Sequence, residues 1–184
     1  MAYLCMTEHP QEYVILGILM KQDRHGYEIH TLLSSGLGRA WYAGISQVYA
    51  LLKRLEAAEK VISAVEQQDN RPAKHVYSIT QKGHEAFLQW VHTPLERMRD
   101  LRLEFLAKLF FIRELRLSCS EDLIRKQADI FQKKLRDITQ QDKDCHEAFE
   151  RLVLRFRIGQ IEAILSWLRD CGRYVHTTST RDAL

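Results

Sequence analysis

The stretch from Ile45 to Gly83 constrains the fold more than any other part of this 184-residue chain. Apolar side chains recur at helical spacing in residues 47–60. Those that share one side of the predicted helix are Val48, Leu51, Leu52 and Leu55. Residues 61–65 and 75–79 are rich in β-branched side chains and alternate as strands do, with a polar, basic turn between them. This order predicts an amphipathic helix that leads directly into an antiparallel hairpin.

The segments on either side of this stretch have the periodicity of helices. Residues 10–22 and 25–35 precede it, and residues 81–93 follow it. Asp23 and Thr80 stand where a side chain can cap the second and the last of these helices. We therefore expect three helices, then the hairpin, then a fourth helix.

Such an order of elements is that of a winged helix-turn-helix. In this kind of domain the third helix enters a DNA groove, and the loop between the strands touches phosphate. Pro94 ends the last predicted helix, so we assign residues 1–94 to a winged-helix DNA-binding domain. The expected fold is mainly α with a small β-wing, which is the α+β class.

The polar side of the third helix carries the candidate DNA contacts. Ser46 is its predicted N-cap and lies, with Ala50 and Lys53, opposite the apolar side, while Tyr49 and Arg54 flank this face. A small residue among hydrogen-bond donors suits the major groove, but any solvated helix also has a polar side. The face alone favours simple solvation, whereas the hairpin that follows favours DNA.

The second half is predicted to be helical, because residues 95–158 contain neither glycine nor proline. Residues 101–115 form a strongly apolar helix. A seven-residue repeat follows, and its two seam positions are held by Ile124, Ala128, Phe131, Leu135, Ile138, Asp142, Cys145, Phe149, Leu152 and Phe156. Four heptads with one polar exception predict a coiled-coil-like arm.

This apolar repeat can be buried in two ways. Two copies of the chain can pair along it, or an intrachain helical hairpin can bury it without a partner. We expect the first, with residues 95–176 as a helical dimerisation domain and residues 177–184 as a disordered tail. The residues expected at the contact between copies are Ile124, Phe131, Leu135, Ile138, Phe149, Leu152, Ile161, Leu165 and Leu168.

Composition sets the background for these expectations. Hydrophobic residues make up 46% of the chain, and the net charge of +3 is too small to demand nucleic acid. No apolar run approaches the roughly 18 residues of a membrane span, so we expect a cytoplasmic protein without a membrane partner. The four cysteines lack zinc-site spacing, and we expect neither a metal nor another cofactor.

Two small groups of residues are the nearest approach to catalytic pairs. They are His25 and His30 with Glu28, and His84 with Glu85. Neither has a nucleophile elbow, a glycine-rich phosphate loop or a second carboxylate in a suitable context. We therefore expect no enzymatic activity. Tyr27, which lies within the first group, is expected to pack in the core or in an interface.

Three segments carry a resemblance to a known family. They are HGYEI at residues 25–29, VYALLKRLE at residues 48–56 and VYSITQKG at residues 76–83. In this order and spacing, the chain resembles the PadR family of bacterial transcriptional regulators. Its second half resembles the longer, virulence-activator type of PadR C-terminal domain, so the resemblance spans nearly the whole chain.

The resemblance implies a homodimer of winged helices that acts as a repressor on a palindromic operator. The positions that it places against DNA are Ser46, Gln47, Tyr49 and Lys53 in the third helix, and Arg71, Lys74 and His75 in the wing. Many relatives have glycine where Glu59 or Lys60 stands here, so the exit of the third helix is expected to differ slightly.

Some members of this family release DNA when a small phenolic or drug-like molecule binds. The second half of the chain holds many aromatic side chains beside cations such as Arg102 and Arg155. These suit a small aromatic effector in a cavity between the winged domain and the C-terminal helices. Ordinary core packing accounts for the same aromatics. The alternative to a DNA-binding regulator is a winged-helix protein-interaction module that does not bind DNA.

Overall fold

The computed structural model describes residues 10–35, 43–68 and 71–181, without the side chains of residues 35, 67–68, 71–74 and 173–181. The chain forms two compact units. The first consists of Met1–His92 with Leu103–Arg116, and the second of Thr93–Arg102 with Leu117–Leu184.

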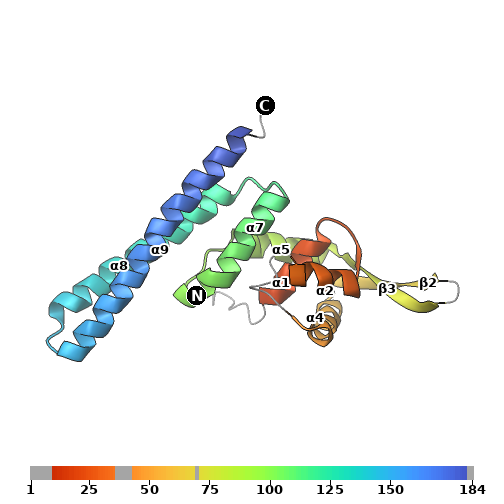
Figure 1. Ribbon diagram of the computed structural model, residues 1–184, viewed down its shortest axis with the longest axis horizontal. Helices are drawn as coiled ribbons and strands as arrows, with labels where there is room; N and C mark the ends of the chain where they lie inside the picture. Colours follow the sequence, from red (N-terminus) through yellow and green to blue (C-terminus); the bar gives the residue numbers. More distant parts are fainter. Residues whose placement is uncertain (1–9, 36–42, 69–70, 182–184) are drawn as a thin grey trace. The chain divides into compact units, whose positions relative to one another are not determined.

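The first unit is the predicted winged helix-turn-helix, mainly helical with a small sheet (Figure 1). Its helices before and after the wing are α1 (Pro10–Leu19), α2 (Gly26–Ser35), α4 (Ile45–Ala57) and α5 (Gln81–His92). Its strands are β1 (Arg24–His25), β2 (Val61–Gln68) and β3 (Arg71–Ile79), hydrogen-bonded in the antiparallel order β1-β3-β2. The fold class inferred from the sequence is confirmed.

The core of this unit is formed by the predicted apolar side of α4 and by α1. The four apolar residues of α4, Val48, Leu51, Leu52 and Leu55, are at most 2% exposed, and Val14, Ile15 and Leu16 of α1 are fully buried. Burying each such side chain contributes about 1.5–3 kcal/mol relative to leaving it in water. The opposite side of α4 is thereby fixed toward solvent.

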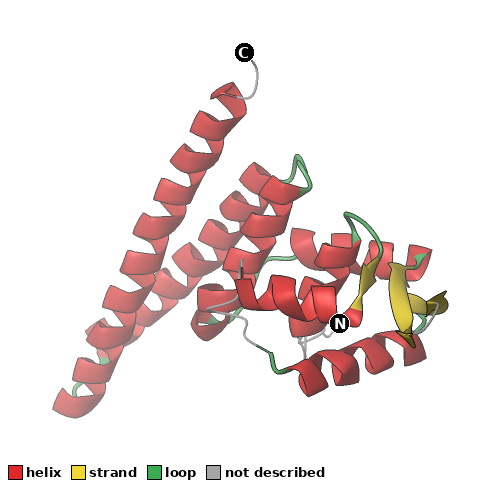
Figure 2. Ribbon diagram, turned by 45° about the vertical axis from the view of Figure 1, so that its right-hand side comes forward, coloured by secondary structure: helices red, strands yellow, loops and turns green. Residues whose placement is uncertain are grey.

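The wing is longer than the sequence indicates. β2 and β3 pair from Val61↔Ile79 outward, and their hairpin extends away from the helices (Figures 1 and 2). The segment expected as a polar loop is mostly strand, because backbone pairing continues past the β-branched runs. The sequence analysis missed β1, whose two residues pair with Tyr77 and Val76 of β3. Two residues are too few to show a period.

Two of the three expected helix caps are wrong. Gly44, and not Ser46, is the N-cap of α4, and it provides no side-chain cap. α2 begins after β1, where the backbone amide of His25 donates to Glu28 Oε2 at 2.9 Å, so Asp23 is not its cap. The cap of α5 is confirmed, since Thr80 Oγ1 accepts from the amide of Gly83 at 3.1 Å.

The end of α4 is joined tightly to the start of α5. Glu59 adopts a left-handed conformation, with φ of 58°, and its carbonyl accepts from Thr80 Oγ1 at 2.7 Å. A Cβ atom on Gly83 would lie 2.1 Å from the carbonyl oxygen of Lys60. Only glycine allows that approach, so the junction depends on the backbone of both helices.

A later segment returns to the first unit. It comprises the end of the π-helix η1 (Leu101–Phe105) and α7 (Leu106–Glu114). Trp90 Nε1 donates to Glu104 Oε1 at 2.7 Å, and the buried Lys108 pairs with the same oxygen at 3.3 Å. The ring of Phe111 lies on Gly17, where a Cβ atom would be 2.6 Å away. The expected boundary at Pro94 therefore does not separate all later helices from the first unit.

The second unit is built on a hairpin of α8 (Ser120–Asp144) and α9 (Ala148–Arg181), with the one-turn α6 (Met98–Asp100) before it (Figure 1). The seven-residue repeat of residues 124–156 is divided between these two helices. Helix α8 ends at Asp144, and the Glu147 side chain accepts from the amides of Phe149 and Glu150 at the start of α9. These bonds hold the pKa of Glu147 below its usual value.

The end of the chain also differs from its prediction. Residues 177–184 were expected to be disordered, but α9 continues to Arg181. The last three residues lie outside the described part of the chain. The polar composition of this tail concealed the helix, because propensity alone is a weak guide at the end of a long helix.

The left-handed residue Glu59 yields a stability prediction. A left-handed conformation costs a side chain that has a Cβ atom about 1–2 kcal/mol, and glycine avoids most of this cost. Glu59→Gly should therefore be more stable to urea than Glu59→Ala by about 1 kcal/mol. Both variants lose the same exposed ion pair with Lys82, so the difference reports the backbone. Equal stability of the two variants would contradict a left-handed conformation at residue 59.

Candidate nucleic-acid interface

The exposed side of α4 contains all the helix positions proposed from the sequence to contact DNA. Ser46, Gln47, Tyr49, Lys53 and Arg54 are all exposed. Tyr49 retains 45% of its surface, although it is a large ring beside the core. Because the opposite side of α4 is fully buried, this surface is presented by a helix that cannot rotate.

Two of these side chains are turned toward α1. Gln47 Nε2 donates to Gln11 Oε1 at 2.9 Å, and Arg54 Nε pairs with Glu12 Oε1 at 3.0 Å. An exposed pair of this kind contributes little to stability, but it orients both partners. Ser46, Tyr49 and Lys53 form the rest of the polar face, which we call the α4 face.

The position of Tyr49 is fixed by a glycine in α2. A Cβ atom on Gly26 would lie 2.6 Å from the Tyr49 ring, so the ring rests on the backbone where α2 begins. Beneath it, burial raises the pKa of Tyr77, with smaller contributions from Glu56 and Tyr49. The sequence analysis missed this contact. The only sign of this contact in the sequence is Gly26, a glycine at the first position of a helix, where no turn requires one.

Tyr27, the next residue of α2, is not buried as expected. Its side chain is 70% exposed, and its recorded aromatic neighbour is the ring of His30, at 6.3 Å between centroids. The expectation that it packs in the core is therefore wrong, whereas the expectation that it packs in an interface remains a prediction. Helical periodicity could not show this, because Tyr27 lies only two positions before the buried Ile29.

The base of the wing is held by His25. Its Nε2 lies 3.5 Å from Glu66 Oε2 on β2, and its Nδ1 lies 3.3 Å from the carbonyl oxygen of His75 on β3. His75 itself is exposed. Arg71 and Lys74 belong to β3, opposite Gln68 and Glu66, but their side chains lie outside the described part of the chain.

The nine residues proposed for dimer contact fall into two classes. Six are already buried within the single chain: Ile124, Phe131, Ile138, Ile161, Leu165 and Leu168. Leu135 is half-buried, whereas Phe149 and Leu152 are exposed. Together with Val153 and Phe156, the last two form an exposed apolar row on the first turns of α9, which we call the α9 stripe.

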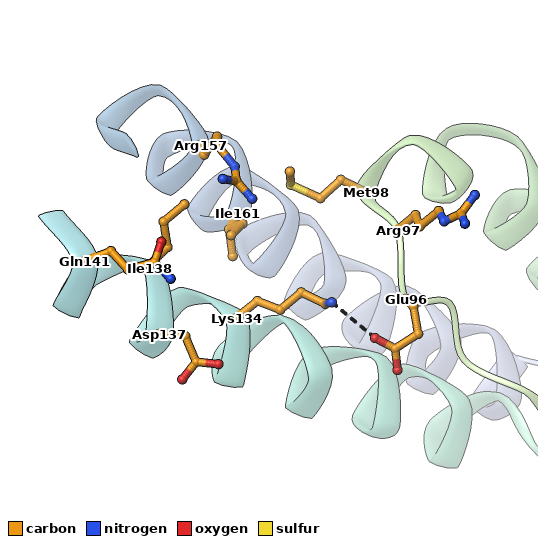
Figure 3. A pocket seen from close by; sticks show the side chains of 9 residues that line it. All are labelled: Glu96, Arg97, Met98, Lys134, Asp137, Ile138, Gln141, Arg157 and Ile161. Atoms are coloured by element: carbon orange, nitrogen blue, oxygen red, sulfur yellow. Dashed lines mark ion pairs between the residues drawn. The ribbon is translucent and has the colours of Figure 1, made fainter. Parts of the chain in front are cut away.

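A pocket of about 320 Å³ opens between residues 96–98 and the α8–α9 hairpin (Figure 3). Ile138 and Ile161 line its base, and Met98 and Arg157 are on its walls. Lys134 Nζ reaches Glu96 Oε2 at 3.1 Å along one side. The pocket therefore combines apolar surface with charged groups of both signs, since Asp137 and Glu96 line it together with Arg157, Arg97 and Lys134. It lies wholly within the second unit.

The described residues contain free thiols, but neither a membrane-spanning helix nor a metal-binding cluster. None of the described helices has both the length and the apolarity to cross a membrane. No group of three histidine, cysteine or acidic side chains among those residues could hold a metal ion. Cys119, Cys145 and Cys171 are free thiols, and burial raises the pKa of Cys171 to about 11.

Two protein-family models match the chain. Residues 15–89 match the Transcriptional regulator PadR-like family, and residues 101–174 match the Virulence activator alpha C-term family. The first match covers α4, the wing and most of α5, and the second covers α7 and the hairpin.

Individual relatives agree with these matches. The Negative transcriptional regulator PadR of Bacillus subtilis (strain 168) is 32% identical over 130 residues, which cover 69% of this chain and 70% of that protein. The Probable transcriptional regulator Rv1176c of Mycobacterium tuberculosis is 31% identical over 90 residues, 49% of this chain and 48% of that protein. A crystal structure of Bacillus subtilis PadR in complex with operator DNA covers 92% of this chain and 99% of its own, at 26% identity and a TM-score of 0.46.

Proposed function

Since the chain belongs to the PadR-like family of transcriptional regulators, we propose that it is a repressor that binds a palindromic operator as a homodimer. The observation that carries this proposal is the two-sided construction of α4. One side is completely buried, and the other presents the α4 face from a fixed position. Repression is supported by the name of the Bacillus subtilis relative, a negative transcriptional regulator.

The α4 face is suited to the major groove of DNA. Ser46 lies at the start of the helix, where recognition helices contact base edges. Lys53 lies one turn after Tyr49, so its ammonium group extends beyond the ring toward the DNA backbone. Gln47 and Arg54 also contact DNA. To do so, Gln47 gives up or shares its hydrogen bond with Gln11, and Arg54 gives up or shares its ion pair with Glu12.

The wing contributes through charge. Arg71, Lys74 and His75 lie along β3, and cations on such a hairpin most often meet phosphate. The hydrogen bond of His25 to the His75 carbonyl on β3, and its contact with the Glu66 carboxylate on β2, support the wing. We therefore propose that the wing contributes to the affinity for DNA and that the α4 face determines the specificity for its base sequence.

The α9 stripe is the surface that supports dimerisation. Phe149, Leu152 and Phe156 are 69%, 63% and 66% exposed, and they recur at helical spacing on one side of α9. Burying each against a second copy would contribute about 1.5–3 kcal/mol. The six buried members of the predicted seam stabilise the hairpin, so the contact between copies falls to Phe149 and Leu152 with their two neighbours.

A small aromatic carboxylate is the proposed effector. The pocket of the second unit has an apolar base at Ile138 and Ile161, and the guanidinium group of Arg157 can pair with a carboxylate. Its volume is at the lower end of the range for small-molecule sites. A ligand that prefers one arrangement of residues 96–98 shifts the spacing of the two winged units by mass action.

The first prediction from this proposal concerns Lys53. Lys53→Ala should weaken binding to duplexes selected by the protein from a random pool by roughly tenfold, with unchanged folding. It should also reduce the log–log salt slope by about 0.9 for each lost phosphate contact. Fluorescence anisotropy over a salt series measures both quantities. Lys133→Ala, which removes the same charge from exposed α8, is the matched control. Equal affinity of both variants would exclude α4 as the reading helix.

The second prediction concerns the α9 stripe. Phe149→Glu with Phe156→Glu should convert the protein from a dimer to a monomer of 21.6 kDa in light scattering, because the introduced charges cannot be buried without partners. Leu32→Glu, at a 38% exposed position of α2, should remain dimeric. A dimer that survives the double substitution would place the contact elsewhere.

The third prediction concerns the pocket. Hydroxycinnamic and hydroxybenzoic acids should raise the melting temperature of the protein and lower its affinity for the selected duplex. Arg157→Ala should abolish both effects, because it removes the carboxylate partner. Arg169→Ala, on the same helix but outside the pocket, should keep them. If no acid in the panel changes DNA affinity, the effector assignment is wrong.

A further inference from the structure

Tyr27 presents a large side chain to solvent on the first turn of α2. It is 70% exposed, more than any other described large hydrophobic residue of the chain. Its backbone carbonyl accepts from Thr31 Oγ1 at 3.0 Å, as an ordinary helical residue. The position is therefore well ordered by the helix, while the phenol projects from it.

The neighbours of Tyr27 place it beside the α4 face. The ring of Tyr49 lies against the backbone of the preceding residue, Gly26, where a Cβ atom would be only 2.6 Å from the ring. Helices α2 and α4 pack against each other. Tyr27 is thus the sequence neighbour of the residue that Tyr49 touches, and both tyrosines are exposed.

In a helix-turn-helix, the helix before the reading helix crosses the DNA backbone. Among the described helices, α2 is the one before α4, and Tyr27 lies at its N-terminal end. A phenolic hydroxyl is a hydrogen-bond donor, and tyrosine is one of the side chains that bind phosphate oxygens. The only acidic side chain on this turn, Glu28, accepts from the backbone amide of His25 at 2.9 Å. Its carboxylate is thereby held toward its own backbone.

We propose that Tyr27 donates its hydroxyl hydrogen to a DNA phosphate and so fixes the orientation in which α4 enters the groove. This inference rests on the proposed DNA-binding function and adds to it a neutral backbone contact outside α4 and the wing. The ring of Tyr27 carries no charge, so the contact gives affinity without reading a base and without releasing a counterion.

The test replaces only the hydroxyl group. Tyr27→Phe should weaken binding to the selected duplex and to a scrambled duplex by a similar factor, at least about tenfold for a lost hydrogen bond to a charged group. Its salt slope should equal that of the wild type, unlike that of Lys53→Ala. Ser34→Ala, which removes an exposed hydroxyl two turns later in α2, should bind as the wild type does.

Each other outcome has a definite meaning. Unchanged affinity of Tyr27→Phe for both duplexes would overturn the proposal, and would leave Tyr27 as a candidate protein contact. A loss confined to the selected duplex would also overturn it, because the hydroxyl would then read a base. Failure of the wild-type protein to bind any duplex would instead overturn the proposed function, and that measurement comes first.

Discussion

The junction between the end of α4 and the start of α5 is the constraint on which the rest of the first unit depends. The carbonyl of Glu59 accepts from Thr80 Oγ1, and that of Lys60 accepts from the amide of Thr80 at 3.1 Å. Gly83 admits the Lys60 carbonyl to a distance that no other residue allows. Strand β2 begins at Val61, directly after this junction, and β3 ends at Ile79, directly before it. Helix α4 and the wing therefore start from one shared junction.

This shared junction fixes the surface that we propose to bind DNA. The buried side of α4 prevents rotation, so the α4 face keeps a constant orientation relative to the wing. The contact of Tyr49 with Gly26 adds the start of α2 to the same surface. Helix α2, helix α4 and the wing thus present polar groups in fixed positions relative to one another. Binding to a DNA duplex would then require no reorganisation of this unit.

The sequence predicts those features of this unit that depend on a local pattern. The apolar side of α4 follows from four residues at helical spacing, and the Thr80 cap follows from a hydroxyl before a helix. Features that depend on contacts between distant segments cannot be predicted from a local sequence pattern. Strand β1 exists only because β3 pairs with it, and Tyr27 is exposed because of what α2 packs against.

The second unit shows a different limit of sequence reasoning. The seven-residue repeat continues in phase through residues 145–147, although the helix stops there. The turn contains neither glycine nor proline, and Glu147 supplies the new N-terminal bonds through its side chain. Pattern alone cannot distinguish a hairpin from a paired arm, because both bury the same residues. Of the candidate site, the helix positions were predictable from spacing, whereas the division of the seam into buried residues and the α9 stripe was not.

The central claim is that two copies of the chain present two α4 faces to successive grooves of one duplex. Hydroxyl-radical footprinting of the full chain on its selected duplex tests this directly. Two protected segments are expected, related by two-fold sequence symmetry, with centres about 10 base pairs or a multiple of that apart. A single protected segment without sequence symmetry would contradict it.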